Sequence, residues 1–350
     1  MNNNNRINRI RRTLMRGLTQ NVGTEHVNPP AGALGNAAIK RILVSRPNHR
    51  LGNQLLLTPL IEELEATFPG STVDVFVRGG LAHVLFKNYT SIGKVFKLPK
   101  RPLNEIINYL KVWNAVSRGK YDLAINVAKG SASGRMGIQR ARAAYKIFGD
   151  LPEAAAQQYP DYIHMAKYPV YMLRSEMAQL GFSVQSGPVP VMDLKLDAPE
   201  LAQGKARLDA LVPPDKKTIS IFTYATGSKC YTPEWWLPVY EKLKARFPDY
   251  NIVEVLPAEN VSQVNFAAPT FYSHDVREIA ALISSTALFI GADSGIMHLA
   301  SAAKARTVGL FSVTDPERYG PYGNGSVAVN TNITDADGLI NVVASLLNGA

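Results

Sequence analysis

The stretch FIGADSGIMHLA at residues 289–300 decides the fold of this 350-residue chain. A buried apolar strand is predicted to end at Ile290, and a helix follows within a few residues. Gly291 and Gly295 allow the backbone to turn tightly between the two elements. Because the first amides of a helix have no partner inside the helix, the turn is predicted to receive the oxygens of a phosphate.

Two side chains beside this turn are candidate ligand contacts. Ser294 supplies a hydroxyl donor, and His298, one turn into the helix, can donate to a diphosphate that gains charge as it leaves a sugar. A structural interpretation is also open, in which Asp293, Ser294 and Gly295 cap the helix and His298 packs on the sheet. The residues of this stretch alone do not distinguish the ligand-binding interpretation from the structural one.

Apolar strands alternate with amphipathic helices on both sides of this stretch, which predicts parallel βαβ units. A segment rich in Pro, Gly and Asp at 183–214 predicts a domain boundary. We expect an α/β protein with a basic extension at 1–39, a Rossmann-like domain at 40–187 and a second one at 188–350, facing a central cleft. The expected strands are 41–45, 72–77, 121–127, 218–223, 251–256, 287–290 and 307–311. One expected helix ends near residue 68, and the others span 135–147, 235–246, 276–284 and 297–303.

Composition limits the class of protein. The chain has 38 Lys and Arg against 28 Asp and Glu, a net charge of +10 that favours polyanionic partners. Cys230, the single cysteine, excludes an internal disulfide and a multi-cysteine zinc site. The longest apolar stretch, 279–292, is shorter than the roughly 20 residues of a membrane span, and residues 1–20 lack a secretory pattern. We therefore expect a cytoplasmic protein, and the absence of a basic stripe interleaved with aromatics argues against nucleic acid.

The first 39 residues carry five Arg and one Glu. If Ile7, Ile10, Leu14 and Leu18 line one face of a helix, the arginines lie mostly off that face, which predicts contact with an anionic membrane surface. The alternative is a frayed terminal tail.

Residues 289–323 resemble the donor-binding signature of glycosyltransferase family nine, the heptosyltransferases of lipopolysaccharide core synthesis. The family pattern is D-S-G-x-x-H-L-A, then L-F-G-x-T-D-P and G-P, and Ser312 replaces its usual glycine. The matching residues are Asp293, Ser294, Gly295, His298, Leu299, Ala300, Thr314, Asp315, Pro316, Gly320 and Pro321. The resemblance implies a GT-B fold, a single inverting displacement without a metal ion, an acceptor held mainly by the first domain and a donor held mainly by the second.

The stretch LGNQLLLTPLI at 51–61 resembles the family's G-D-x-L-x-T-P segment, whose Asp is taken as the base that deprotonates the acceptor. Asn53 stands at that place, and an amide cannot accept the proton, although it can still orient the acceptor hydroxyl. General-base assistance is worth about 10² to 10⁴ in rate, so another base or low activity is expected. His49 is the nearest titratable candidate, unless it is only an exposed loop histidine.

Acceptor contacts are assigned to Arg50 and Gly52 in the same loop. Arg135, which follows a run of small residues, is a third candidate, for a contact with the acceptor phosphate or the donor sugar, unless it is an exposed arginine at the start of a helix.

The segment ATGSKCYTPEWW at 225–236 looks like the family's diphosphate loop, a G-S-x-x-x-T-K-x-W pattern. Pro233 replaces the family's Lys, and Lys229 can take over its charge or remain a solvated loop residue. With the helix turn, the loop completes the predicted donor site: Thr226, Gly227, Ser228, Lys229, Thr232, Asp293, Ser294, Gly295, Met297 and His298.

The resemblance implies transfer of a sugar from a nucleoside-diphosphate donor, with ADP-heptose as the family's example, to the lipopolysaccharide core or another cell-surface glycan. It implies no cofactor beyond the nucleotide sugar, and an acceptor that is a lipid-linked saccharide at the inner membrane, where the protein would bind peripherally. Two alternatives stay open: a sugar-nucleotide epimerase, which needs no acceptor, and a catalytically silent sugar-nucleotide or glycan-binding protein, which Asn53 makes credible.

Overall fold

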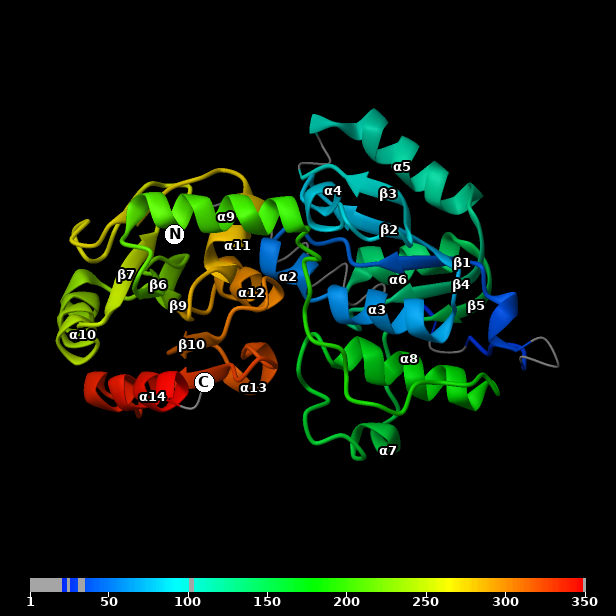
Figure 1. Cartoon of the computed structure of the whole chain (residues 1–350). Helices are drawn as coiled ribbons and strands as arrows, with labels where there is room; N and C mark the ends of the chain where they lie inside the picture. Colours follow the sequence, from blue (N-terminus) through cyan, green and yellow to red (C-terminus); the bar gives the residue numbers. More distant parts are fainter. Residues whose placement is uncertain (1–20, 24–25, 31–34, 101–103, 349–350) are drawn as a thin grey trace.

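Two parallel β-sheets, each covered by helices, form two domains side by side (Figure 1). The computed structural model describes residues 21–23, 26–30, 35–100 and 104–348, so the apolar face proposed for Ile7 to Leu18 lies outside the described residues. No helix in these ranges is long and apolar enough to cross a membrane. The expected α/β fold of two Rossmann-like domains is confirmed.

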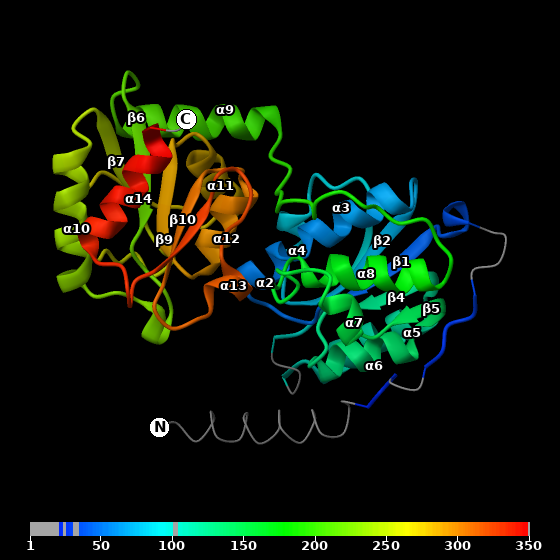
Figure 2. The same ribbon diagram turned by 90° about the horizontal axis from the view of Figure 1, so that it is seen from below.

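The first sheet has the strand order β3-β2-β1-β4-β5. Its inner strands β2, β1 and β4 are mostly buried, as expected when helices cover both faces of a parallel sheet, whereas the edge strands β3 and β5 are more exposed. Helices α3 and α8 pack on one face, and α5 and α6 pack on the other (Figure 2). The elements are η2 (Asn36–Ala38), β1 (Arg41–Ser45), α2 (Leu51–Leu55), α3 (Thr58–Thr67), β2 (Thr72–Arg78), α4 (Ala82–Leu85), β3 (Ile92–Leu98), α5 (Ile106–Arg118), β4 (Lys120–Asn126), α6 (Ala132–Arg140), β5 (Arg142–Ile147), α7 (Glu153–Ala156) and α8 (Tyr168–Gln179).

The second sheet has the order β11-β10-β9-β6-β7-β8. Helices α10 and α14 cover one face, and α9, α11 and α12 cover the face nearer the first domain. The elements are α9 (Ala198–Leu211), β6 (Lys217–Phe222), η4 (Gly227–Lys229), α10 (Pro233–Arg246), β7 (Tyr250–Val255), β8 (Thr270–Phe271), α11 (Val276–Ser284), β9 (Leu288–Ala292), α12 (Gly295–Ala302), β10 (Thr307–Phe311), α13 (Pro316–Tyr319), β11 (Val327–Asn330) and α14 (Ala336–Asn348).

The expected helix at 135–147 is wrong in its second half. Helix α6 ends at Arg140, and residues 142–147 form β5, which pairs in parallel with β4. Tyr145 and Ile147 are buried while Lys146 between them is partly exposed, which is the period of a strand. Ala143 and Ala144 favour a helix over a strand, so pairing with β4 overrides the local preference.

The Pro- and Gly-rich segment at 183–214 is not all linker. Residues 182–197 have no helix or strand, and the boundary predicted at residue 188 falls among them. Helix α9 then starts at Ala198, because the Asp197 side chain accepts from the Glu200 amide and Glu200 accepts in return from the Asp197 amide. With a proline in the first turn, this reciprocal cap was a readable helix signal in the sequence.

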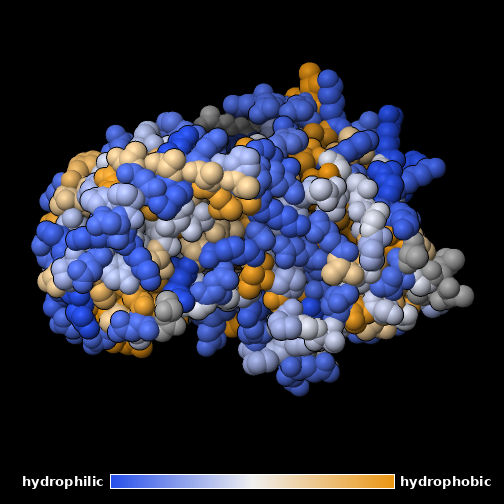
Figure 3. Space-filling view, in the orientation of Figure 1, coloured by the Kyte–Doolittle hydropathy of each residue, from blue (hydrophilic) through white to orange (hydrophobic). Residues whose placement is uncertain are grey.

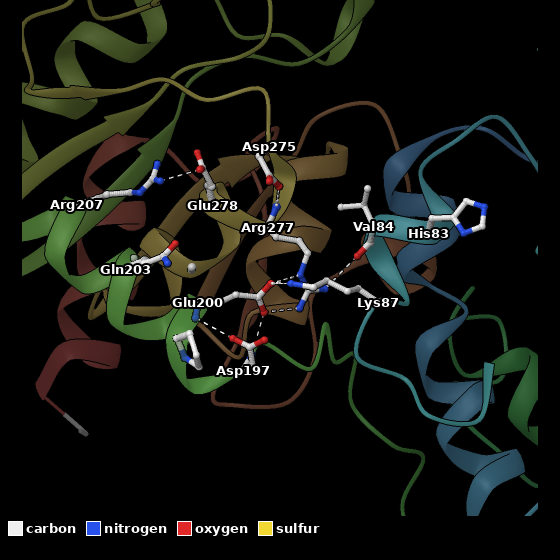
Figure 4. A pocket seen from close by; sticks show the side chains of 13 residues that line it. His83, Val84, Lys87, Asp197, Glu200, Gln203, Arg207, Asp275, Arg277 and Glu278 are labelled. Carbon is white, nitrogen blue, oxygen red and sulfur yellow. Dashed lines mark hydrogen bonds and ion pairs between the residues drawn. The ribbon is translucent and has the colours of Figure 1, made fainter. Parts of the chain in front are cut away.

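An ion network joins the domains beside the domain boundary, as Figure 4 shows. Arg277 of α11 donates from Nε and Nη2 to the two carboxylate oxygens of Glu200, at 2.6 and 2.7 Å. Its Nη1 donates to the carbonyl of Val84 in the first domain and to that of Leu194. Lys87, also in the first domain, adds a second cation to Glu200 at 3.1 Å.

Apolar packing completes this interface. Leu55, Leu56 and Leu85 of the first domain lie in the same buried cluster as Met297 and Leu299 of α12. The relative position of the domains is therefore fixed by a core as well as by the network.

Replacing Arg277 with Met leaves Glu200 and the carbonyl of Val84 without their buried cation. We expect the free energy of unfolding to fall by about 3 kcal/mol, because removing one partner of a buried pair is costly. Lys242→Met, which removes an exposed pair with Asp337, is the matched control and should change it by less than about 0.5 kcal/mol. Urea unfolding measures both, and equal losses would contradict this account of the interface.

Candidate functional site

A cavity of about 700 Å³ lies between the domains. In each sheet the strand order reverses, beside β1 in the first and between β6 and β9 in the second, and ligands of such folds bind beyond the carboxyl ends of the strands at these points. The loops that follow β1, β6 and β9 all line the cavity. They contribute three groups of residues: 49–53, 224–226 with 229, and 293–296 with 298.

Helix α12 begins at the cavity wall. The Ser294 hydroxyl accepts a hydrogen bond from the amide of Met297, at 3.3 Å, and so caps the helix. The amides of Gly295 and Ile296 come before the capped one, have no acceptor within the helix, and belong to residues that line the cavity. The positive end of the helix therefore faces the space between the domains, as the proposed anion site requires.

Two glycines allow α12 to meet α2 of the other domain. A Cβ atom on Gly295 would lie 3.0 Å from the Cβ of Leu51, and one on Gly52 would lie 2.5 Å from Cδ2 of His298. A side chain at residue 52 would thus displace the histidine or separate the domains. Gly52, predicted as an acceptor contact, lines the cavity and also makes this close approach possible.

Asp293 holds a cation at the start of α12. Its Oδ2 accepts from Lys229 Nζ at 3.1 Å and from the Thr314 hydroxyl at 2.6 Å. Lys229 is therefore neither distant from the cavity nor simply solvated, since it lines the cavity while paired with Asp293. Gly227 has a positive φ of 68°, which suits glycine in the turn that brings Lys229 back.

His298 is buried, with 4% of its surface exposed, and its ring still borders the cavity. Its Nε2 lies 3.9 Å from Asp293 Oδ1, and its buried Nδ1 has no hydrogen-bond partner in the part of the chain that the structure describes. Burial lowers the pKa of His298 to about 4, against the opposing effect of the Asp293 charge. The ring is therefore neutral near pH 7 and carries an unused polar atom.

Asn53 lines the cavity and is oriented by a buried arginine. Arg46 Nη2 donates to Asn53 Oδ1 at 2.7 Å. A guanidinium has only donors, so the amide oxygen must face Arg46, and the NH₂ group is the part left for a ligand. Burial lowers the pKa of Arg46 to about 10, so it remains charged at neutral pH. Asn53 thus offers a donor where a base would have to accept a proton.

The other predicted residues divide into three groups. His49, Arg50 and Thr226 line the cavity and are exposed. Ser228 and Thr232 are exposed but do not line it, and neither does Gly227. Met297 is fully buried in the core, so only its capped amide belongs to the turn.

The acceptor contact predicted for Arg135 needs correction, as does its alternative of an exposed residue. Arg135 is 1% exposed and donates to the carbonyls of Val22 and Phe148 and to Asp150. It does not line the cavity. Its guanidinium holds the segment before the first sheet against β5 and the loop after it.

Sequence reasoning missed much of the cavity wall. The missed lining residues are mainly apolar and come from the ends of β6 and β7 and from α11: Phe222, Tyr224, Leu256, Pro257, Val276 and Ile279. Glu259, Ser273, His274 and Tyr319 add polar groups. Arg46 was also missed; its position directly after the first strand was the available signal. Among the described residues, no group of three or more His, Cys, Asp and Glu is arranged to hold a metal.

A two-domain α/β protein with a cavity at facing strand ends has the GT-B architecture. Three comparisons extend this result. Residues 244–338 match the model of glycosyltransferase family 9 (heptosyltransferase). Lipopolysaccharide heptosyltransferase 3 of Escherichia coli K12 is 24% identical over 299 residues, which cover 77% of this chain and 82% of that protein. The predicted resemblance to glycosyltransferase family 9 is therefore confirmed.

Solved structures agree on the fold. A glycosyltransferase family 9 protein from Veillonella parvula has a TM-score of 0.71 at 18% identity, covering 90% of this chain and 100% of that one. The E. coli heptosyltransferase WaaC with ADP has a TM-score of 0.65 at 16% identity, covering 87% and 99%.

The low pKa of His298 predicts a pH dependence of stability. Between its ordinary pKa of 6.5 and its folded value of about 4, the folded chain binds fewer protons at this ring than the unfolded chain does, so acid favours unfolding. On lowering the pH from about 7 to about 5, the free energy of unfolding of the native protein should fall. We expect this fall to be about 2 kcal/mol larger than the fall in the His298→Asn variant, which lacks the titrating ring. Urea unfolding at both pH values measures this, and parallel pH profiles would refute it.

Proposed function

We propose that this protein is an inverting glycosyltransferase that moves a sugar from a nucleoside-diphosphate donor to a saccharide acceptor of the cell surface. The observation that carries the proposal is the start of α12 at the interdomain cavity, with the amides of Gly295 and Ile296, the cation of Lys229 and the neutral ring of His298 on one side of it. Together these groups supply donors to a diphosphate as its charge grows.

The cavity also has room and chemistry for the rest of a nucleotide. Its apolar wall, which includes Phe222, Leu256 and Val276, suits a flat base, and Glu259 and Ser273 can accept from or donate to ribose hydroxyls. A heptosyltransferase of the same fold, WaaC, was solved with ADP and with an ADP-heptose analogue, and this supports ADP-heptose as the donor.

In the proposed reaction an acceptor oxygen attacks the anomeric carbon, and the bond from that carbon to the diphosphate breaks. The nucleoside diphosphate leaves with the bonding electron pair, stabilised by α12 and Lys229, and the hydroxyl proton passes to a base. His49 is the proposed base, because it lines the cavity from the first domain and Asn53 presents a donor. Arg50, beside it, is the proposed acceptor contact.

The proposed acceptor is a lipid-linked saccharide of the lipopolysaccharide core at the cytoplasmic face of the inner membrane. Its support is the similarity to lipopolysaccharide heptosyltransferase 3 and the basic residues of 1–39. Binding of the chain to anionic vesicles with and without residues 1–39 tests the contact of that segment. We expect weaker binding without it, and equal binding would remove the contact.

A second candidate function is that of a silent sugar-nucleotide-binding protein. Asn53 favours it, because an amide cannot act as a base and the bond from Arg46 leaves only its NH₂ donor for a ligand.

Two variants separate the candidates, assayed with ADP-heptose and a core saccharide. If His49 is the base, His49→Gln should lower kcat about 10²- to 10⁴-fold with little change in ADP binding, whereas His274→Gln, across the cavity, should leave kcat within about threefold. Release of ADP measures kcat, and calorimetry measures ADP binding. Full transfer by His49→Gln excludes His49, and ADP-heptose binding without transfer, unchanged in Asn53→Asp, supports the silent protein.

A further inference from the structure

Three apolar side chains project into solvent from the first two turns of α5. Ile106 is 49% exposed, Ile107 68% and Leu110 59%. Figure 3 shows hydrophobic side chains standing out among hydrophilic ones at the top of the first domain, where α5 begins. Single exposed apolar residues are ordinary, but a group of three on adjacent turns calls for a partner. We call these three residues the α5 tip.

The α5 tip is not needed to hold the helix in place. Trp113 and Val116 are buried against the sheet, and the ring of Trp113 packs on the edge of Phe76 at 5.3 Å between centroids. At 100° per residue, positions 109, 112, 113 and 116 form this inner face, positions 107 and 110 lie off it, and Ile106, which lies on the side of Trp113, is exposed at the first residue of the helix. The start of the helix therefore has an apolar patch that no described element covers.

The surroundings of the tip are cationic. Between residues 94 and 120 the sequence has seven basic residues and one acid, Glu105. Those that the structure describes are all exposed; Lys97 and Lys100 lie at the end of β3 that leads to the tip and Lys111 follows Leu110, whereas Lys94, Arg118 and Lys120 lie toward the opposite ends of β3 and α5. An apolar helix end within a basic surface is the chemistry that inserts at the headgroup level of an anionic bilayer.

The tip also stands on the acceptor side of the cavity. The segment from Leu98 to Ile106 leads from the carboxyl end of β3 to α5. Along it, Lys100 lies against the loop of the proposed base: a Cβ on Gly79 would be 3.1 Å from Lys100 Cε and 3.4 Å from His49 Cβ. Lys100, six residues before the tip, therefore borders the loop that lines the cavity.

We propose that the α5 tip, with its surrounding lysines, docks the protein on an anionic lipid bilayer. This placement rests on the proposed function, since it brings a lipid-linked acceptor to the rim of the cavity beside His49. A bilayer suits the tip better than a second protein, because three side chains are few for a stable interface, which buries roughly 800 Å² on each partner.

The test is flotation of the full-length chain with vesicles of equimolar phosphatidylcholine and phosphatidylglycerol, and with vesicles of phosphatidylcholine alone. The double variant Ile107→Ser, Leu110→Ser should bind the anionic vesicles about tenfold more weakly than the native chain. The matched control is Val313→Ser, Ile333→Ser, which removes residues 57% and 84% exposed in the second domain and should bind like the native chain. Both variants should keep the native melting temperature, since all four side chains are exposed.

Equal binding of the native chain and the α5 variant would overturn the proposal, as would an equal loss in the control. A change from dimer to monomer on sedimentation of the α5 variant would assign the tip to a second copy of the chain, and this also overturns it.

Transfer to a soluble, lipid-free saccharide separates this proposal from the proposed function. The α5 variant should transfer to the soluble acceptor as well as the native chain does. Vesicle binding through the tip without transfer to any acceptor would leave the docking surface in place and refute the glycosyltransferase.

Discussion

The close approach of α2 and α12 is the constraint on which the rest of the site depends. A side chain at Gly52 would meet His298, and one at Gly295 would meet Leu51, so either would force the two helices apart. Since each helix belongs to a different domain, this contact fixes the distance across the cavity. The network around Arg277 and the shared apolar cluster hold the same interface.

At Asp293 and Asn53 the acceptor oxygens are occupied by groups of the protein, so a ligand meets mainly donors there. Asp293 is occupied by Lys229 and Thr314, and the oxygen of Asn53 is occupied by Arg46. The neutral ring of His298 adds a polar atom without adding a charge. These donors can stabilise an anionic leaving group. A base that removes the proton of the acceptor must come from another residue of the cavity.

The sequence predicts best the parts of the molecule whose signals are local. Strand β9, Ser294 as a cap and Gly295 lie within residues 288–295, so the start of α12 was readable, although the strand continues to Ala292 and Gly291 lies within it and not in the turn. Residues 142–147 were not, because a strand of mixed composition is decided by its partner β4. Arg46, Arg135 and Arg277 look alike in the sequence, and only contacts made across the fold show that one orients Asn53 and two hold structure.

A crystal structure of the protein with ADP tests the central claim most directly. The account predicts a diphosphate between the domains, with its oxygens within hydrogen-bond distance of the amides of Gly295 and Ile296 and of Lys229 Nζ. A diphosphate bound outside this cavity, or one that leaves the start of α12 without contact, would contradict it.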